Sequence, residues 1–148
     1  MELIKNFYNH TKENKPKPKY IEKSFSLKLG NYDFVGKMDR ADSINSGIEI
    51  IDYKTGKIPK ATKNLEQLHI YQWATEEYLK EKVEGLKYWY LQDNEFIQEE
   101  LTTPETINQL KTKLLGVIER MIDAIKYDRF KELHAKVKDH NCDFENLE

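Results

Sequence analysis

Hydrophobic and polar positions alternate along the first half of the chain, a pattern typical of β-strands. The alternation runs over residues 20–29, breaks at a Gly-Asn turn signal at 30–31, and resumes over 32–41. After a second turn at 45–47, residues 48–53 are nearly all apolar on either side of their carboxylates, as expected of a central strand buried on both faces. The first half is therefore predicted to contain a three-stranded meander.

Apolar residues recur at helical spacing in three other segments. The first helix is expected over residues 1–13 and is followed by a lysine- and proline-rich link. A second helix is expected over 64–82, with Asn64 as its N-cap. A third, long helix is expected to begin at Pro104, because Thr103 before it is a favourable N-cap and proline suits the first helical position.

Two more strands are expected between the second and third helices, over 86–92 and 96–101, joined by a tight turn. The order is thus helix, three-strand meander, helix, hairpin, helix. It predicts an α/β (α+β) fold in which a mixed sheet is flanked by helices. The 148 residues fit a single domain over 1–148. That this domain is a fragment of a longer chain stays open.

Composition excludes several classes of protein. The formal net charge is −2, so a polyanionic partner would have to be bound by a local patch rather than a global positive field. No apolar run approaches the ~20 residues of a membrane span, and no signal-peptide pattern opens the chain, so a cytoplasmic protein without a membrane partner is expected. Cys142 is the single cysteine, so no iron–sulfur cluster, which needs four thiolates, is expected.

Two carboxylates lie near the ends of expected strands. Asp39 is near the end of the second strand and Asp52 near the end of the third. Lys54 follows two residues after Asp52, so both side chains share one face of the strand, and Asp39 can reach that face from the neighbouring strand. Two carboxylates and an ammonium suit a hard divalent cation such as Mg²⁺. The alternative is an ordinary surface ion pair worth under ~1 kcal/mol.

Three sequence motifs surround these residues. The chain reads Gly-Lys-Met-Asp-Arg-Ala-Asp over 36–42, Ile-Ile-Asp-Tyr-Lys-Thr-Gly over 50–56 and Gln-Leu-His-Ile-Tyr over 67–71. Together they resemble the RecB-like branch of the PD-(D/E)XK nuclease superfamily. This branch includes nuclease domains of bacterial helicase–nuclease complexes and CRISPR-associated RecB-like exonucleases. The resemblance implies a restriction-endonuclease-like core.

The resemblance also implies roles for individual residues. Asp39 and Asp52 would bind Mg²⁺ or Mn²⁺, with the carbonyl of Tyr53 as a third ligand. Lys54 would be the catalytic lysine that positions or activates the attacking water. Within the first motif, a structural ion pair between the arginine and the second aspartate is the favoured interpretation.

Substrate contacts and two weaker metal-site candidates complete the expected site. Gln67 and Tyr71 lie one helical turn apart, and the resemblance implies that they line the site and contact the nucleic-acid backbone or Lys54, although plain helix packing is the alternative. Loop lysines beside the site would contact phosphates, or else form an ordinary solvated loop; they are Lys57 and Lys60. Glu22 and His10 are the weaker candidates. Glu22 resembles an upstream acidic position of the family, whereas the proline-bearing link after His10 departs from the family spacing, and a solvent-exposed histidine at a helix end is the alternative.

The activity that the resemblance implies is metal-dependent hydrolysis of DNA, of the exonuclease type that processes DNA ends in repair or recombination. DNA is then the substrate, and a helicase subunit or domain is a candidate partner. The alternative is a catalytically idle module of the same fold that binds DNA or scaffolds a helicase. The intact set of Asp39, Asp52 and Lys54 favours the enzyme.

Overall fold

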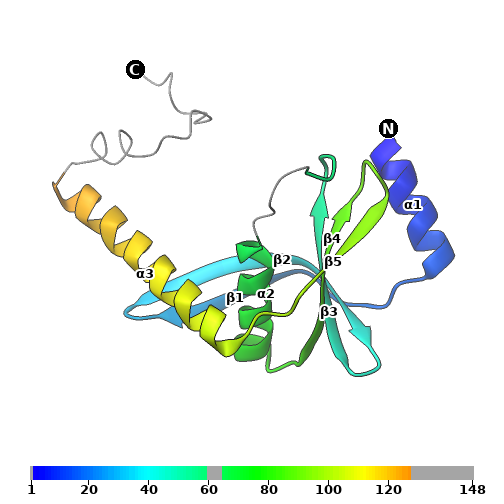
Figure 1. Cartoon of the computed structure of the whole chain (residues 1–148). Coiled ribbons are helices and arrows are strands. Elements are labelled where there is room, and N and C mark those ends of the chain that lie inside the picture. Colours follow the sequence, from blue (N-terminus) through cyan, green and yellow to red (C-terminus); the bar gives the residue numbers. More distant parts are fainter. Residues whose placement is uncertain (1, 60–64, 128–148) are drawn as a thin grey trace, which may run out of the picture. The chain divides into compact units, whose positions relative to one another are not determined.

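The fold is described from a computed structural model, over residues 2–59 and 65–127. Five strands form one sheet whose spatial order follows the chain. They are β1 (Pro18–Leu29), β2 (Tyr32–Ile44), β3 (Gly47–Lys54), β4 (Val83–Tyr90) and β5 (Glu95–Glu99). Neighbouring strands are antiparallel except β3 and β4, which are parallel (Figure 1). The predicted mixed sheet, with β3 at its centre, is confirmed.

The helices are α1 (Glu2–Asn14), α2 (Glu66–Ala74) and α3 (Pro104–Tyr127), and α2 continues directly into a π-helical turn, η1 (Thr75–Leu79). Parallel neighbours such as β3 and β4 need a crossover, which α2 and η1 supply. The expected cap of α3 is confirmed, since the Thr106 N–H donates to Thr103 Oγ1 at 3.2 Å. None of the helices in the described part is both long and apolar enough to cross a membrane.

The crossover helix is shorter than the sequence predicted. Helix α2 begins at Glu66, and η1 ends where Lys80 adopts a left-handed backbone conformation with φ of 58°. The predicted helix over 64–82 therefore runs too far, because β4 already begins at Val83 and the chain needs the intervening residues to turn. The predicted N-cap, Asn64, lies outside the described residues.

The core lies on both faces of β3 and β4. Ile50 and Leu86 are fully buried on these strands, and the buried side chains of α2 include Leu68 and Trp73. Burying side chains of this size contributes roughly 1.5–3 kcal/mol each. This packing fixes β3 between two layers, so that its last residues are held at a defined edge of the sheet.

The two faces of the sheet carry different helices. Tyr53 of β3 contacts Phe7 of α1, with ring centroids 5.9 Å apart, whereas the next residue, Lys54, bonds to Gln67 of α2. Successive side chains of a strand point to opposite faces. Helices α1 and α2 therefore cover opposite faces, and Asp52 lies on the face of α2.

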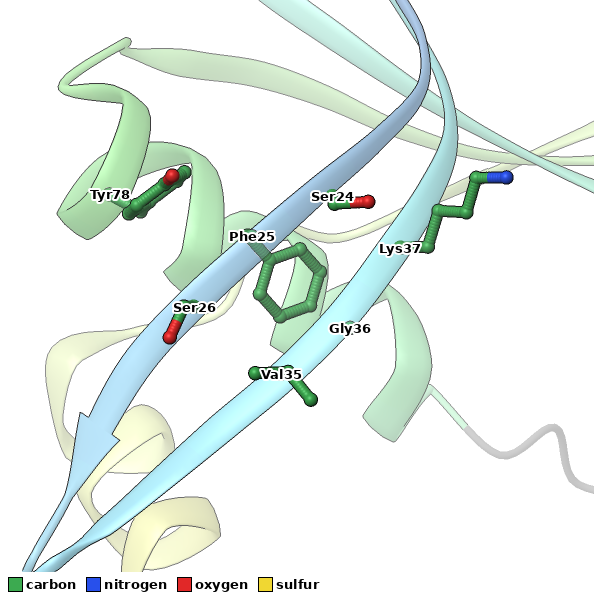
Figure 2. A pocket seen from close by; sticks show the side chains of 7 residues that line it. All are labelled: Ser24, Phe25, Ser26, Val35, Gly36, Lys37 and Tyr78. Carbon is green, nitrogen blue, oxygen red and sulfur yellow. The ribbon is translucent and has the colours of Figure 1, made fainter.

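The β1–β2 hairpin extends beyond the other strands. Gly36 of β2 pairs with Phe25 of β1, and a Cβ at Gly36 would lie only 2.3 Å from the Phe25 ring. Figure 2 shows this ring beside the bare Gly36 backbone, at a cavity of about 520 Å³ that Tyr78 of η1 also lines. The glycine of the first motif is thus required by the close approach of an aromatic ring.

Candidate active site

The site is built where β2 separates from β3. The backbone pairing of these strands ends at Arg40 and Ile51, although β2 remains paired with β1 as far as Tyr32. The next antiparallel pair would be Asp39 and Asp52, so the two carboxylates lie at the point of divergence. The Tyr53 N–H donates to Asp39 Oδ2 at 3.1 Å. The side chain of Asp39 thus accepts a hydrogen bond from a backbone N–H of β3 at the point where the backbone pairing of β2 and β3 ends.

Asp52 is a carboxylate in a nearly water-free position. Its side chain is 1% exposed, and Oδ2 lies 2.6 Å from Lys54 Nζ in an ionic contact that lacks the angle of a hydrogen bond. Burial raises the pKa of Asp52, the ammonium of Lys54 lowers it, and the charge of Asp39 raises it again. Burial disfavours the ionised carboxylate more than the Lys54 ammonium favours it, so a further cation beside Asp52 would be favourable.

Lys54 joins the sheet to α2 through a chain of hydrogen bonds. Its Nζ donates to Gln67 Oε1 at 2.7 Å, and Gln67 Nε2 donates to the hydroxyl oxygen of Tyr71 at 2.9 Å. The Lys54 side chain is 34% exposed, so its ammonium is held in place but still reaches solvent. Burial and the two nearby carboxylates raise the pKa of Tyr71, against the hydrogen bond from Gln67. Its phenol is therefore neutral at physiological pH.

Two carboxylates supply only part of the ligand set of a divalent metal, so water molecules and substrate oxygens would have to supply the rest. In the parts of the chain that are described, no three or more His, Cys, Asp or Glu side chains gather into a set able to hold a metal ion. Mg²⁺ commonly keeps several waters and binds through one or two carboxylates together with substrate phosphates. Asp39 and Asp52 suit this kind of open site, since the buried Oδ2 of Asp52 lacks a hydrogen-bond donor.

The structure does not bring every expected residue to this cluster. Glu22 of β1 forms its ion pair with Lys37 of β2. Lys57 is exposed in the loop after β3, and Lys60 lies outside the described residues. These three remain predictions.

His10 lies on the opposite face of the sheet. Its ring packs against Trp89 and Phe96, with centroid distances of 4.7 and 4.8 Å. Trp89 follows Tyr88 on β4 and so faces away from the carboxylates. Burial, together with the charge of Arg40, lowers the pKa of His10. Its observed surroundings are those of a packed aromatic ring.

The structural ion pair expected in the first motif is confirmed. Arg40 Nε donates to Asp42 Oδ1 at 2.6 Å, and a second guanidinium nitrogen bonds to Oδ2, so the pair is bidentate. Both residues are buried. The pair belongs to the α1 face, where Arg40 also donates to the Tyr53 hydroxyl at 3.3 Å.

Sequence reasoning missed one residue of the site, Tyr88. The Lys54 ammonium lies 5.0 Å from the centre of the Tyr88 ring, and burial and the charge of Asp52 raise the pKa of the phenol far above its usual value. Tyr88 is the register partner of Asp52 across the parallel β3–β4 ladder. Only the strand pairing could have revealed this neighbour, because the two residues are 36 positions apart in the chain.

Comparison with known families agrees with this geometry. The family model of the PD-(D/E)XK nuclease superfamily matches residues 2–146, nearly the whole chain. The chain belongs to the PD-(D/E)XK nuclease superfamily. Its five-stranded mixed sheet with flanking helices is consistent with the restriction-endonuclease-like fold of that class. A search of individual curated proteins gave no match.

Proposed function

We propose that this protein is a divalent-metal-dependent deoxyribonuclease of the RecB-like branch. The observation that carries the proposal is the convergence of Asp39, Asp52 and Lys54 where β2 leaves β3. The membership of the superfamily supports the same conclusion. The order of the three sequence motifs supports the assignment to the branch.

The proposed reaction is hydrolysis of a phosphodiester bond. A water oxygen forms a bond to phosphorus and gives up a proton to solvent, while the bond to one ester oxygen breaks and that oxygen leaves with a proton from solvent. Asp39 and Asp52, with the Tyr53 carbonyl, would hold Mg²⁺ or Mn²⁺, which when bound lowers the pKa of a bound water and offsets negative charge on the phosphate.

Lys54 would act directly on the reacting groups. Its ammonium has three N–H donors, of which one is directed to Gln67. Another can donate to the attacking water or to a phosphate oxygen, which stabilises the charge that develops in the transition state. Gln67 and Tyr71 hold the lysine from α2, so they position the ammonium rather than react.

The proposed substrate is DNA, bound mainly through its phosphates and cut from its ends. Exposed Lys57 in the loop after β3, with Lys60 further along that segment, would contact phosphates, and such contacts carry no sequence information. This favours end processing, as in repair or recombination beside a helicase subunit or domain, over cutting at a fixed sequence. Glu22 stays a weaker candidate ligand for this metal, whereas His10 lies on the opposite face of the sheet, away from Asp39 and Asp52. A cytoplasmic setting belongs to the same proposal.

Cleavage of end-labelled linear DNA and matched circular DNA, with Mg²⁺ or Mn²⁺, tests the proposal. We expect metal-dependent degradation of the linear DNA, sparing of the circle, and loss of activity in Asp52→Ala and Lys54→Ala. Lys87→Ala, which removes a lysine on the opposite face, is the matched control and should cut normally. Cleavage that survives both site substitutions would show that the activity arises elsewhere.

The idle-module alternative makes a different prediction. A scaffold without a metal site should show no rise in melting temperature when Mn²⁺ is added, whereas a metal site gains stability with ligand concentration. Absence of both cleavage and a Mn²⁺-dependent shift would replace the enzyme with the scaffold.

A further inference from the structure

We infer that Tyr88 is a positioning residue that holds the catalytic ammonium of Lys54 while a metal occupies Asp52. The inference rests on the proposed function of the same site. Tyr88 touches neither the substrate nor the metal in this account; it acts through Lys54.

Three groups surround the Lys54 ammonium. Asp52 Oδ2 lies at 2.6 Å, Gln67 Oε1 at 2.7 Å, and the centre of the Tyr88 ring at 5.0 Å. The ring is 2% exposed and is fixed by the β3–β4 ladder, in which Tyr88 is the partner of Asp52. A buried ring in a fixed orientation presents its negatively polarised face to the cation.

These three partners do not respond alike when a metal binds. Asp52 would then be shared between two cations, and the metal would repel the ammonium that now contacts the same carboxylate. The Tyr88 ring attracts a cation through its quadrupole and does not compete for the metal. In the metal-free protein, burial and the charge of Asp52 raise the pKa of Tyr88, so its phenol is neutral there. The ring and Gln67 are therefore the partners that keep Lys54 at the site.

Fixing this side chain matters because lysine has unusually many rotamers. Holding a free lysine side chain in one rotamer costs conformational entropy, so a Lys54 without these contacts would occupy its reactive position for only part of the time. Without these contacts the Lys54 side chain, which is already 34% exposed, could turn away into solvent. The ring is thus a second contact, besides Gln67, that restricts Lys54.

The experiment compares Tyr88→Phe, Tyr88→Leu and Trp89→Leu with the wild type. Phenylalanine keeps the ring and leucine removes it, whereas Trp89→Leu removes another buried ring of β4, on the face away from Lys54, as the packing control. We expect Tyr88→Leu to lower kcat for DNA cleavage about tenfold with KM unchanged, as loss of a partly desolvated cation–ring contact predicts. Tyr88→Phe should keep wild-type kcat. Equal kcat in Tyr88→Leu and Trp89→Leu would overturn the inference.

A second readout needs neither cleavage nor a substituted protein. The Hε protons of Lys54 should resonate upfield in the wild type, because they lie over the ring, and should stay upfield when Mg²⁺ is added without DNA. Loss of that shift on Mg²⁺ addition would overturn the inference even if Tyr88→Leu failed to fold. An unchanged shift in a protein that cuts no DNA would instead overturn the proposed function and leave Tyr88 a structural contact.

Discussion

The carboxyl group of Asp52 lies where water scarcely reaches it, and the Lys54 ammonium balances its negative charge only in part. Burial raises its pKa despite the adjacent Lys54 ammonium. A packed core has no need of such a carboxylate, and an apolar side chain would stabilise the position better. Perturbed carboxylates of this kind are concentrated at functional sites, which is why Asp52 is the most informative single residue of the chain.

The raised pKa of Asp52 predicts how stability depends on pH in the absence of metal. In the unfolded chain this carboxyl loses its proton near pH 3.9, but in the folded protein it does so at higher pH. The folded state therefore binds more protons between the two values, and stability falls as pH rises through that window. Asp52→Asn should be more stable than the wild type in metal-free urea denaturation at pH 7, and this advantage should disappear below about pH 3.9. An advantage that persists in acid would contradict the assignment.

The buried Arg40–Asp42 pair leads to a prediction about stability alone. Asp42→Ala would leave a guanidinium that is 5% exposed with only the Tyr53 hydroxyl as a described side-chain partner. Breaking a buried pair in this way costs about 3–5 kcal/mol, whereas replacing both partners with apolar residues costs far less. Urea denaturation should therefore show a large loss for Asp42→Ala and a much smaller one for Arg40→Met with Asp42→Leu. Equal losses would mean that the pair is not desolvated in solution.

At the scale of elements, the sequence predicted those helices and strands whose positions depend on the local pattern of residues. The alternation before and after residues 30–31 predicted the β1–β2 hairpin, and Thr103 with Pro104 predicted the start of α3. The end of η1 and the start of β4 were misplaced, since charged residues around 80–82 suit a helix and a turn equally well. The π-helical turn has no sequence signal, because it depends on how the crossover fits against the sheet.

The hairpin and α2 are linked through Gly36, and this link can be tested. The Phe25 ring lies across Gly36 and meets Tyr71 of α2 edge-on, with centroids 6.2 Å apart. Gly36→Ala forces the ring away, and overpacking of this kind costs typically ~1–3 kcal/mol. Phe25→Leu combined with Gly36→Ala should recover part of that loss in urea denaturation. Greater loss in the double variant than in Gly36→Ala alone would show that the ring is not what excludes the Cβ.

At the scale of the whole molecule, the site depends on three separate segments that the sheet and crossover bring together. Sequence motifs were sufficient to select Asp39, Asp52, Lys54, Gln67 and Tyr71, all of which the structure places in one hydrogen-bonded or electrostatic neighbourhood. They could not place His10, whose face of the sheet depends on how α1 packs. Nor could they find Tyr88, which becomes a neighbour only through parallel pairing of β3 and β4.

The most direct test of the account is the rate of DNA cleavage as a function of Mn²⁺ concentration in the wild type, Asp52→Asn and Glu49→Gln. Glu49 is the matched control, because it is also a carboxylate of β3 but is paired with Lys87 at 2.7 Å, away from Lys54. We predict a saturable, Mn²⁺-dependent rate in the wild type and in Glu49→Gln, and none in Asp52→Asn at any Mn²⁺ concentration. The same Mn²⁺ dependence in all three proteins would contradict the proposal that Asp52 binds the metal used for cleavage.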